Sequence, residues 1–253
     1  TRGHAWYFAA ALGQARAVEI GLKHFRSLYE TCSGAILWQF NDMWPAISWA
    51  VLDYTGFRKL AWHAMKSAYQ PRAIVVGRVD QGAQITLLND RPDPWQTKVE
   101  LFLINNIGAV VKTHLIEVDL DRYSVSRTPA IEIFPEIADG NYEGFILATC
   151  PEVRASRRTT LAPAKESPKH DLEAHAQISN GELMVNVTAK TYLHELSFMP
   201  ELLALGTQVD AQIVSLLPGE SHTFKVTGDP KDLIEISKQV EDLLWSHNRI
   251  VNQ

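Results

Sequence analysis

Apolar residues recur every three or four positions near the start of the chain, which is the spacing of one face of an α-helix. These residues are Tyr7, Ala11, Ala15, Val18, Leu22 and Phe25. After a short polar break, a nearly continuous apolar run over residues 35–40 predicts a parallel strand that is buried on both faces. An irregular, Trp-rich stretch then leads to a second predicted helix over residues 57–69, which Pro71 ends.

This order of helix, buried strand, long loop and helix is the repeating unit of an α/β barrel. A closed barrel takes about 250 residues, so one unit cannot form it. We therefore predict that residues 1–71 are a piece of a larger barrel. Such a piece exposes apolar surface and unpaired strand edges. We therefore expect it to be disordered, to pack on another copy of the chain, or to be held by a partner, the N-terminal remainder of the same protein.

From residue 73 the pattern changes to the alternation of β-strands, interrupted by turn residues. The predicted strands cover residues 74–79, 84–88, 98–104, 110–118, 131–134 and 142–149. Several short strands at this spacing are typical of an antiparallel, immunoglobulin-like β-sandwich. Pro163 and Pro168 mark a linker over residues 161–169, so the first sandwich is predicted to span residues 72–163.

A second set of alternating segments predicts another β-sandwich over residues 164–253. Its strands are predicted at residues 172–178, 182–187, 191–196, 211–216 and 222–226. Asn180-Gly181 is a strong signal for a two-residue hairpin between the first two. A C-terminal helix then starts at Pro230, with Asp229 as its N-cap. One face of that helix is predicted to carry Leu233, Ile236, Val240, Leu243 and His247.

Composition narrows the class of partner and cofactor. The chain has 46% hydrophobic and 21% charged residues and a net charge of −5, which argues against a nucleic-acid surface. No apolar run reaches the roughly 20 residues of a membrane-spanning helix, so we predict no membrane partner. Cys32 and Cys150 are interpreted as two buried free thiols. No His, Cys, Asp or Glu cluster has metal-ligand spacing, so we predict no metal and no cofactor. The cellular compartment stays unknown.

The most informative motif is the stretch from Gly34 to Pro45, GAILWQFNDMWP, which is followed by Ser48-Trp49 and Asp53-Tyr54. It resembles the eighth barrel strand and the following loop of the β-mannosidases in glycoside hydrolase family 2. Two later stretches, LAPAK from Leu161 and LLPGE from Leu216, are similar to the linker and last hairpin of that family's two C-terminal sandwich domains. The resemblance covers most of the chain, to about residue 227.

The resemblance implies that residues 1–71 are helix 7, strand 8 and helix 8 of a (β/α)8 TIM barrel. It also implies a retaining hydrolysis of terminal, non-reducing β-D-mannose. That reaction needs two carboxylates about 5–5.5 Å apart, one as nucleophile and one as acid/base. In the family these are glutamates at the ends of strands four and seven, so we expect both upstream of Thr1. Glu19 and Glu30 match neither position. The chain alone is predicted to be inactive.

Four residues of the motif are candidate contacts to a mannoside or oligosaccharide substrate. Trp38 lies at the end of the predicted strand, where barrel active sites are built, and an indole can stack on the C–H face of a pyranose. Asn41 and Asp42 can bond sugar hydroxyls or hold neighbouring side chains, and Trp44 can form an apolar wall. The resemblance further implies a cis peptide bond after Trp38.

Plainer interpretations stay open for each of these residues. Trp38 and Trp44 can be core aromatics, while Asn41 and Asp42 can shape a local turn or orient the loop. For the chain as a whole, the alternatives are a non-catalytic carbohydrate-binding or structural sandwich module, and a family 2 relative with β-galactosidase or β-glucuronidase specificity. Asp90 and Asp93 form either a carbohydrate or calcium loop or a simple hairpin connection.

Overall fold

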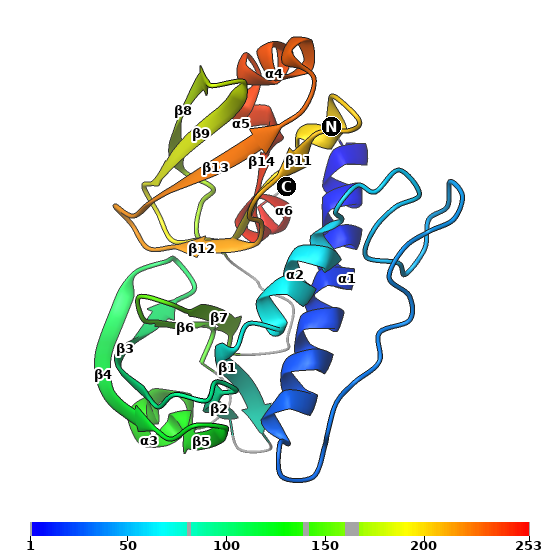
Figure 1. Ribbon diagram of the computed structural model, residues 1–253. Helices are drawn as coiled ribbons and strands as arrows, with labels where there is room; N and C mark the ends of the chain where they lie inside the picture. The colour runs from blue at the N-terminus through cyan, green and yellow to red at the C-terminus, as the bar shows by residue number, and fades with distance from the viewer. Residues whose placement is uncertain (1, 80–81, 139–141, 160–166, 253) are drawn as a thin grey trace. The chain divides into compact units, whose positions relative to one another are not determined.

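The structure, a computed structural model, describes residues 2–79, 82–138, 142–159 and 167–252. Most of its regular elements are β-strands, and the long helix α1 (Arg2–Ser27) opens the chain (Figure 1). The chain divides into two units. Unit 1 consists of Thr1–Glu19, Ile36–Lys66 and Pro168–Gln253, and unit 2 of Ile20–Ala35 and Ser67–Ser167. The predicted domain boundary at residues 163–164 and most of the predicted linker at 161–169 lie outside the described residues.

Both helices predicted in the first 70 residues are confirmed. The buried apolar side chains of α1 are Phe8, Leu12, Ala15 and Leu22. Tyr7 and Phe25, which the spacing places on the predicted apolar face, are exposed instead. The second helix, α2 (Leu60–Ala68), ends before Pro71. Among the described residues, no helix combines the length and the apolar composition that crossing a membrane requires.

The apolar run over residues 35–40 is not the buried strand that its pattern predicts. The structure describes all six residues and assigns none of them to a strand. Ile36 is 97% exposed and Trp38 is 74% exposed. A strand forms only where a neighbouring strand can pair with its backbone N–H and C=O groups. Among the described residues no strand pairs with this run. Only its last residue has a backbone partner across the loop, since the Leu52 N–H bonds the Phe40 carbonyl, and so the run forms no strand.

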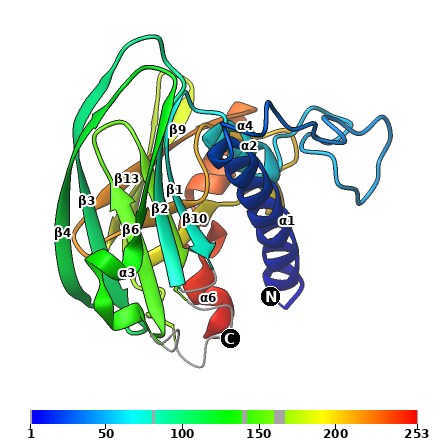
Figure 2. The same ribbon diagram turned by 90° about the horizontal axis from the view of Figure 1, so that it is seen from below.

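Two antiparallel sheets enclose the core of unit 2 (Figure 2). One has the strand order β1-β2-β5 and the other the order β4-β3-β6-β7. The strands are β1 (Arg72–Val79), β2 (Gly82–Asn89), β3 (Trp95–Asn105), β4 (Val110–Leu120), β5 (Ser124–Pro129), β6 (Gly144–Thr149) and β7 (Arg154–Arg158). Alternate side chains of β3, such as Val99, Leu101 and Leu103, point into one shared apolar cluster. The two sheets are therefore held by a common core.

One strand predicted in unit 2 is wrong. Residues 131–134 belong to a short helix, α3 (Ala130–Ile133), and to the start of the 3-10 turn η1 (Pro135–Ile137). The buried side chains here are Ala130, Phe134 and Ile137, whose spacing of four and three is that of a helix. A short apolar run fits either periodicity, and the core contacts decide between them.

The sequence pattern also missed two strands, β5 and β7, because both are polar. β5 pairs with β2, and β7 pairs with β6 at the edge of its sheet. Arg154, Arg157 and Arg158 lie on β7 with half-buried side chains. Edge strands need little apolar content, since only one of their sides pairs with the sheet.

Replacing Gly144 with alanine should destabilise unit 2 by about 1–3 kcal/mol, as overpacking does. A Cβ at this position would lie 2.1 Å from the carbonyl oxygen of Ile104 on the neighbouring strand. That contact is with backbone, which cannot move without disturbing the pairing of β3 with β6. The urea unfolding midpoint measures the loss.

Gly77→Ala is the matched control, because the nearest atom to its added Cβ is 3.8 Å away. We expect this variant to unfold at nearly the wild-type midpoint. An equal loss in the two variants would contradict the steric explanation.

Two sheets also enclose the core of unit 1, with strand orders β11-β13-β9-β8 and β12-β10-β14. The strands are β8 (Leu172–Ser179), β9 (Glu182–Ala189), β10 (Leu193–Phe198), β11 (Gln208–Val209), β12 (Val214–Leu216), β13 (Ser221–Thr227) and β14 (Leu244–Trp245). The predicted hairpin is confirmed: Asn180 and Gly181 have φ values of 53° and 78° and join β8 to β9. Positive φ at both positions is what a two-residue type I′ turn requires.

The C-terminal segment is not the single helix that its pattern predicts. It forms α4 (Pro230–Ser237), α5 (Val240–Leu243), β14 and α6 (His247–Val251). The predicted cap is confirmed, since the Asp229 side chain accepts a hydrogen bond from the Lys231 N–H. The helix is interrupted because Leu244 and Trp245 pair with β10 instead. In unit 1, Trp245 also packs against Phe8 of α1, with the ring centroids 5.9 Å apart.

Candidate functional site

The segment between α1 and α2 presents several large aromatic side chains to solvent. Trp38 is 74% exposed and Trp44 is 67% exposed, and Phe40, Trp49 and Tyr54 are exposed as well. This segment contains neither helix nor strand (Figure 1). Exposing large apolar side chains to water is energetically unfavourable, so a group of indoles on one loop indicates a ligand-binding or interaction surface.

Backbone hydrogen bonds close the base of this loop. The Asp42 N–H donates to the Leu52 carbonyl at 3.1 Å, and the Leu52 N–H donates to the Phe40 carbonyl at 2.9 Å. The Gln14 amide of α1 donates to the Trp49 carbonyl at 2.8 Å. The ends of the loop are therefore fixed within unit 1, and the aromatic side chains project from a defined backbone.

Asp53 forms the turn that leads into α2. Its Oδ1 accepts hydrogen bonds from the N–H groups of Thr55 and Phe57, at 2.8 and 2.9 Å. Gly56 has φ 86°, a conformation that favours glycine. The Asp-Tyr turn implied by the family resemblance is thus present before the helix.

Asp42 lies inside the loop and has two side-chain partners. It is only 6% exposed, and its Oδ2 accepts a hydrogen bond from the Lys59 ammonium group at 2.8 Å. The Ser48 hydroxyl donates to the other carboxylate oxygen. These bonds, first from Lys59 and then from Ser48, lower the pKa of Asp42 below its usual value. Asp42 is therefore a carboxylate anion engaged with its own loop.

The four predicted site residues differ in what their side chains contact: the two indoles face solvent, and the Asn41 and Asp42 side chains bond within the loop. Trp38 and Trp44 are exposed and project from the loop. Asn41 is exposed and uses its amide N–H to bond the Asp42 carbonyl at 3.1 Å, while Asp42 is buried. The peptide bond between Trp38 and Gln39 is cis, as the family resemblance implies.

Sequence reasoning did not single out the two residues that hold Asp42. A signal existed, because no lysine or arginine occurs between Arg26 and Arg58. A carboxylate that becomes buried in this stretch has Arg58 and Lys59 as its nearest downstream cations. Only the folded loop shows that Lys59 is the one used.

No protein-family model matches the chain. β-Mannosidase B of Aspergillus flavus is 27% identical to it over 244 residues, which are 85% of this chain and 28% of that protein. β-Mannosidase B of Aspergillus terreus is 33% identical over 116 residues, which are 43% of this chain and 13% of that protein. The chain is thus similar in sequence to β-mannosidases B over most of its length. It spans less than a third of the length of these relatives.

Solved structures of similar fold belong to longer glycosidases. The crystal structure of a β-D-mannosidase from Dictyoglomus thermophilum has a TM-score of 0.70 and 15% sequence identity, and the match covers 95% of this chain and 29% of that chain. The exo-chitosanase of Amycolatopsis orientalis has a TM-score of 0.63 and 15% identity, covering 89% of this chain and 32% of that chain. At this identity the two matches show that the fold is shared.

Glu30, in the first 71 residues, is held in an ion pair and is not set up as a general acid. Glu30 follows the end of α1 and pairs with Arg127, with an Nη2–Oε2 distance of 2.8 Å. The hydrogen bond from Arg127 is the main reason that the pKa of Glu30 falls to about 2. Such a carboxylate is a poor proton donor near neutral pH. In the part of the chain that the structure describes, no three His, Cys, Asp or Glu side chains are placed to hold a metal ion.

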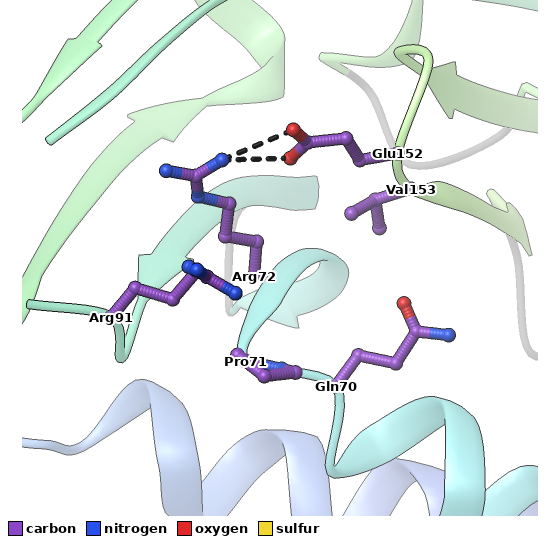
Figure 3. Close-up of a pocket in the computed structure, with 6 residues that line it drawn as sticks. All are labelled: Gln70, Pro71, Arg72, Arg91, Glu152 and Val153. Atoms are coloured by element: carbon purple, nitrogen blue, oxygen red, sulfur yellow. Dashed lines mark hydrogen bonds and ion pairs between the residues drawn. The ribbon is translucent and has the colours of Figure 1, made fainter. Parts of the chain in front are cut away.

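Unit 2 contains a small hollow at the end of its first strand (Figure 3). Its volume is about 160 Å³, and it is lined by Gln70, Pro71, Arg72, Arg91, Glu152 and Val153. Arg72 bonds Glu152 at 3.0 Å and Asp93 at 2.6 Å. Asp93 also accepts a bond from Arg91 at 3.0 Å. The charged groups of this hollow are thus paired with one another.

The acidic loop that contains Asp90 and Asp93 connects β2 to β3, which belong to different sheets, so it is not the predicted hairpin connection. Asp90 pairs with Arg26 at 2.6 Å, and Asp93 pairs with Arg72 and Arg91. These charges, with Arg91 first, lower the pKa of Asp93. Guanidinium groups pair with both carboxylates, which argues against the calcium loop, and the loop is a link between the two sheets of unit 2.

Proposed function

We propose that the chain is the C-terminal part of a retaining glycoside hydrolase that releases terminal, non-reducing β-D-mannose. The relation to the β-mannosidases B supports this proposal, together with the exposed indoles of Trp38 and Trp44 on a loop with a fixed base. In this proposal residues 1–71 form the last unit of a (β/α)8 barrel. Residues 72–163 and 164–253 form two immunoglobulin-like sandwich domains.

In the proposed site the indole of Trp38 stacks on the C–H face of the mannose ring, and Trp44 forms a second apolar wall. Asn41 can offer its amide oxygen to a sugar hydroxyl while its N–H group stays bonded to Asp42. The nucleophile and the acid/base are two glutamates from another part of the protein. The chain by itself therefore binds or shapes the substrate but does not cleave it.

The proposed partner is that other part of the same protein. Ile36 is 97% exposed and Ile47 is 99% exposed, and Met43 is exposed between them. Contiguous apolar side chains of this size mark a surface that is covered in the working protein. Neighbouring barrel strands would cover it and supply the pairing that residues 35–40 lack here. The two isoleucines would then lose their contact with water.

The full-length protein that contains this chain should hydrolyse an aryl β-mannoside, and the chain alone should not. Replacing Trp38 with alanine in the full-length protein should lower kcat/KM about two- to twelvefold, because one stacking contact of an aromatic ring is worth about 0.5–1.5 kcal/mol. Trp49→Ala is the matched control, since it removes an exposed indole of the same loop that is outside the proposed contacts. Initial rates at several substrate concentrations measure both.

The same assay distinguishes the alternatives. Faster hydrolysis of an aryl β-galactoside or β-glucuronide would reject the mannoside specificity and favour another family 2 activity. If the full-length protein hydrolyses none of these, calorimetric titration of the isolated chain with manno-oligosaccharides tests the non-catalytic alternative. Heat of binding that disappears in Trp38→Ala would favour a carbohydrate-binding module.

A further inference from the structure

The loop between the two helices is anchored by a charge. Of residues 36–49, all of which the structure describes, Asp42 is the only buried one. Surface loops are normally anchored by apolar side chains, because a carboxylate loses much of its hydration when it is buried. A carboxylate in this position needs compensating partners, and their identity shows what holds the loop.

Four hydrogen bonds meet at Asp42. Its N–H bonds Leu52, its carbonyl accepts from Asn41, and its two carboxylate oxygens accept from Ser48 and Lys59. The Ser48 hydroxyl is itself fixed in direction, because its oxygen accepts the Ala50 N–H at 3.0 Å. These bonds therefore link Asp42 to its neighbour Asn41 and to three residues further along the chain, Ser48, Leu52 and Lys59.

Lys59 is placed at a position that a cation normally avoids. It directly precedes α2, and its carbonyl accepts the Trp62 N–H at 2.9 Å, so it lies at the N-terminus of the helix. The helix dipole is positive at this end and disfavours a lysine. The Lys59 side chain is only 18% exposed, and its ammonium group lies 2.8 Å from Asp42. The ion pair thus offsets both the burial of the carboxylate and the unfavourable place of the lysine.

We infer that Lys59 is a positioning residue, which acts through the carboxylate of Asp42 to hold residues 38–44 in the shape that presents Trp38 and Trp44. Asp42 then serves the loop instead of a sugar hydroxyl, since it is buried and each of its oxygens already accepts a hydrogen bond. The meaning of this role for catalysis rests on the proposed function. The ion pair itself can be tested in the chain without any sugar.

Hydrogen exchange of the chain, followed by mass spectrometry, tests the ion pair. In Lys59→Met the amides of Asp42 and Leu52 should exchange about tenfold faster than in the wild type. The backbone hydrogen bonds that protect these two amides lose the ion pair that holds Asp42 in place. Lys59→Arg, which keeps the charge, should restore slow exchange. Peptides from β9 and β13 serve as internal controls and should not change. Unchanged exchange of Asp42 and Leu52 in Lys59→Met would overturn the inference.

A double variant distinguishes action through Asp42 from a separate effect of Lys59. If the lysine acts only through the carboxylate, Lys59→Met combined with Asp42→Asn should exchange no faster than Asp42→Asn alone. Additive effects of the two substitutions would overturn the inference.

The catalytic consequence is measured in the full-length protein. Lys59→Met should raise KM for the aryl β-mannoside severalfold more than it lowers kcat, because a loosened loop weakens binding of the sugar in ground and transition state alike. Lys59→Arg should recover most of the affinity. Faster exchange with wild-type KM would overturn the positioning role. A wild-type protein without mannosidase activity would instead reject the proposed function. The exchange experiment would still show whether the ion pair of Lys59 and Asp42 holds the loop.

Discussion

Replacing Glu201 with glutamine should stabilise unit 1 by about 3–4 kcal/mol at pH 8 and by little at pH 5. Glu201 lies on the 3-10 turn η2 (Pro200–Leu202), beside the buried Met199. Its Oε2 atom is buried and has no hydrogen-bond partner among the described residues. Burial raises the pKa of Glu201 from 4.5 to about 8. Ionising this carboxyl group therefore opposes folding.

The sign of the effect follows from the two pKa values of Glu201. Because the folded-state pKa is the higher one, its contribution to stability is complete below pH 4.5 and is lost as the pH rises through 8. At 1.36 kcal/mol for each pKa unit, the full loss is close to 5 kcal/mol. A glutamine, which cannot ionise, should remove this loss.

The buried His63 and the half-buried His170 affect stability in the opposite direction, and they titrate at lower pH. Burial lowers the pKa of His63 from 6.5 to about 3 and that of His170 from 6.5 to about 4. Their neutral forms are favoured in the folded state, so their contribution grows as the pH rises and is complete above 6.5. The window from pH 6.5 to 8 therefore isolates Glu201. Tyr7, whose pKa is raised to about 12 by the partial burial of its side chain and by the nearby Glu201, titrates only at higher pH.

Urea unfolding at several pH values between 5 and 8.5 measures the prediction. The wild-type free energy of unfolding should fall between pH 6.5 and 8, whereas that of Glu201→Gln should stay nearly level. Glu235→Gln is the control, because Glu235 lies on the exposed side of α4, paired with Lys238. Parallel profiles of wild type and Glu201→Gln would show that Glu201 is ionised in the folded chain at neutral pH.

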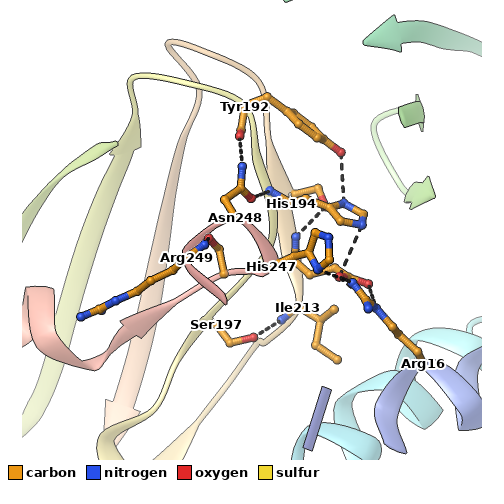
Figure 4. Close-up of polar contacts among 11 residues, drawn as sticks. Arg16, Tyr192, His194, Ser197, Ile213, His247, Asn248 and Arg249 are labelled. Atoms are coloured by element: carbon orange, nitrogen blue, oxygen red, sulfur yellow. Dashed lines mark hydrogen bonds and ion pairs between the residues drawn. The ribbon is translucent and has the colours of Figure 1, made fainter. Parts of the chain in front are cut away.

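Replacing Arg16 with methionine should destabilise unit 1 by about 3 kcal/mol, the lower end of the range for breaking a largely buried ion pair. Arg16 of α1 donates from its Nε to Glu195 at 2.8 Å, and its Nη2 donates to the second carboxylate oxygen (Figure 4). Nη2 also donates to Nδ1 of His247 at 3.0 Å. Without the guanidinium group, the Glu195 carboxylate loses its bidentate partner while its side chain remains only 11% exposed.

A thermodynamic cycle checks whether the charge or the packing is responsible. Glu195→Gln added to Arg16→Met should recover part of the lost stability, because it removes the charge that Arg16 compensates. Lys238→Met, which breaks the exposed pair with Glu235, is the matched control and should cost less than about 0.5 kcal/mol. If Arg16→Met and the double variant lose the same free energy of unfolding, the packing of α1 and not the charge is responsible.

Local signals in the sequence predicted much of the architecture because they act over a few residues. Asn180-Gly181 specified its hairpin through the positive φ values that both residues tolerate. Asp229 and Pro230 specified the start of α4 in the same local way. Most strands of both units followed from alternation. Polar edge strands such as β7 gave no such signal, since their place depends on a neighbour distant in the sequence.

For the candidate site, the sequence predicted which residue types gather in the loop but not which way they point. Four residues were grouped as substrate contacts from their chemistry and from their place in the motif that resembles the family. The structure exposes Trp38 and Trp44 and buries Asp42, because Lys59, which is 17 positions away, reaches that carboxylate. Spacing along a loop does not determine side-chain direction when the backbone is irregular.

The chain's own residues determined its turns, its caps and the alternation of most of its strands, because each rests on conformational preferences of neighbouring residues. Tertiary structure decided the remaining features. It interrupted the C-terminal helix so that Leu244 and Trp245 pair with β10, and it left residues 35–40 without a strand partner. Both outcomes depend on which backbone groups find a partner across space, and local sequence preferences do not contain that information.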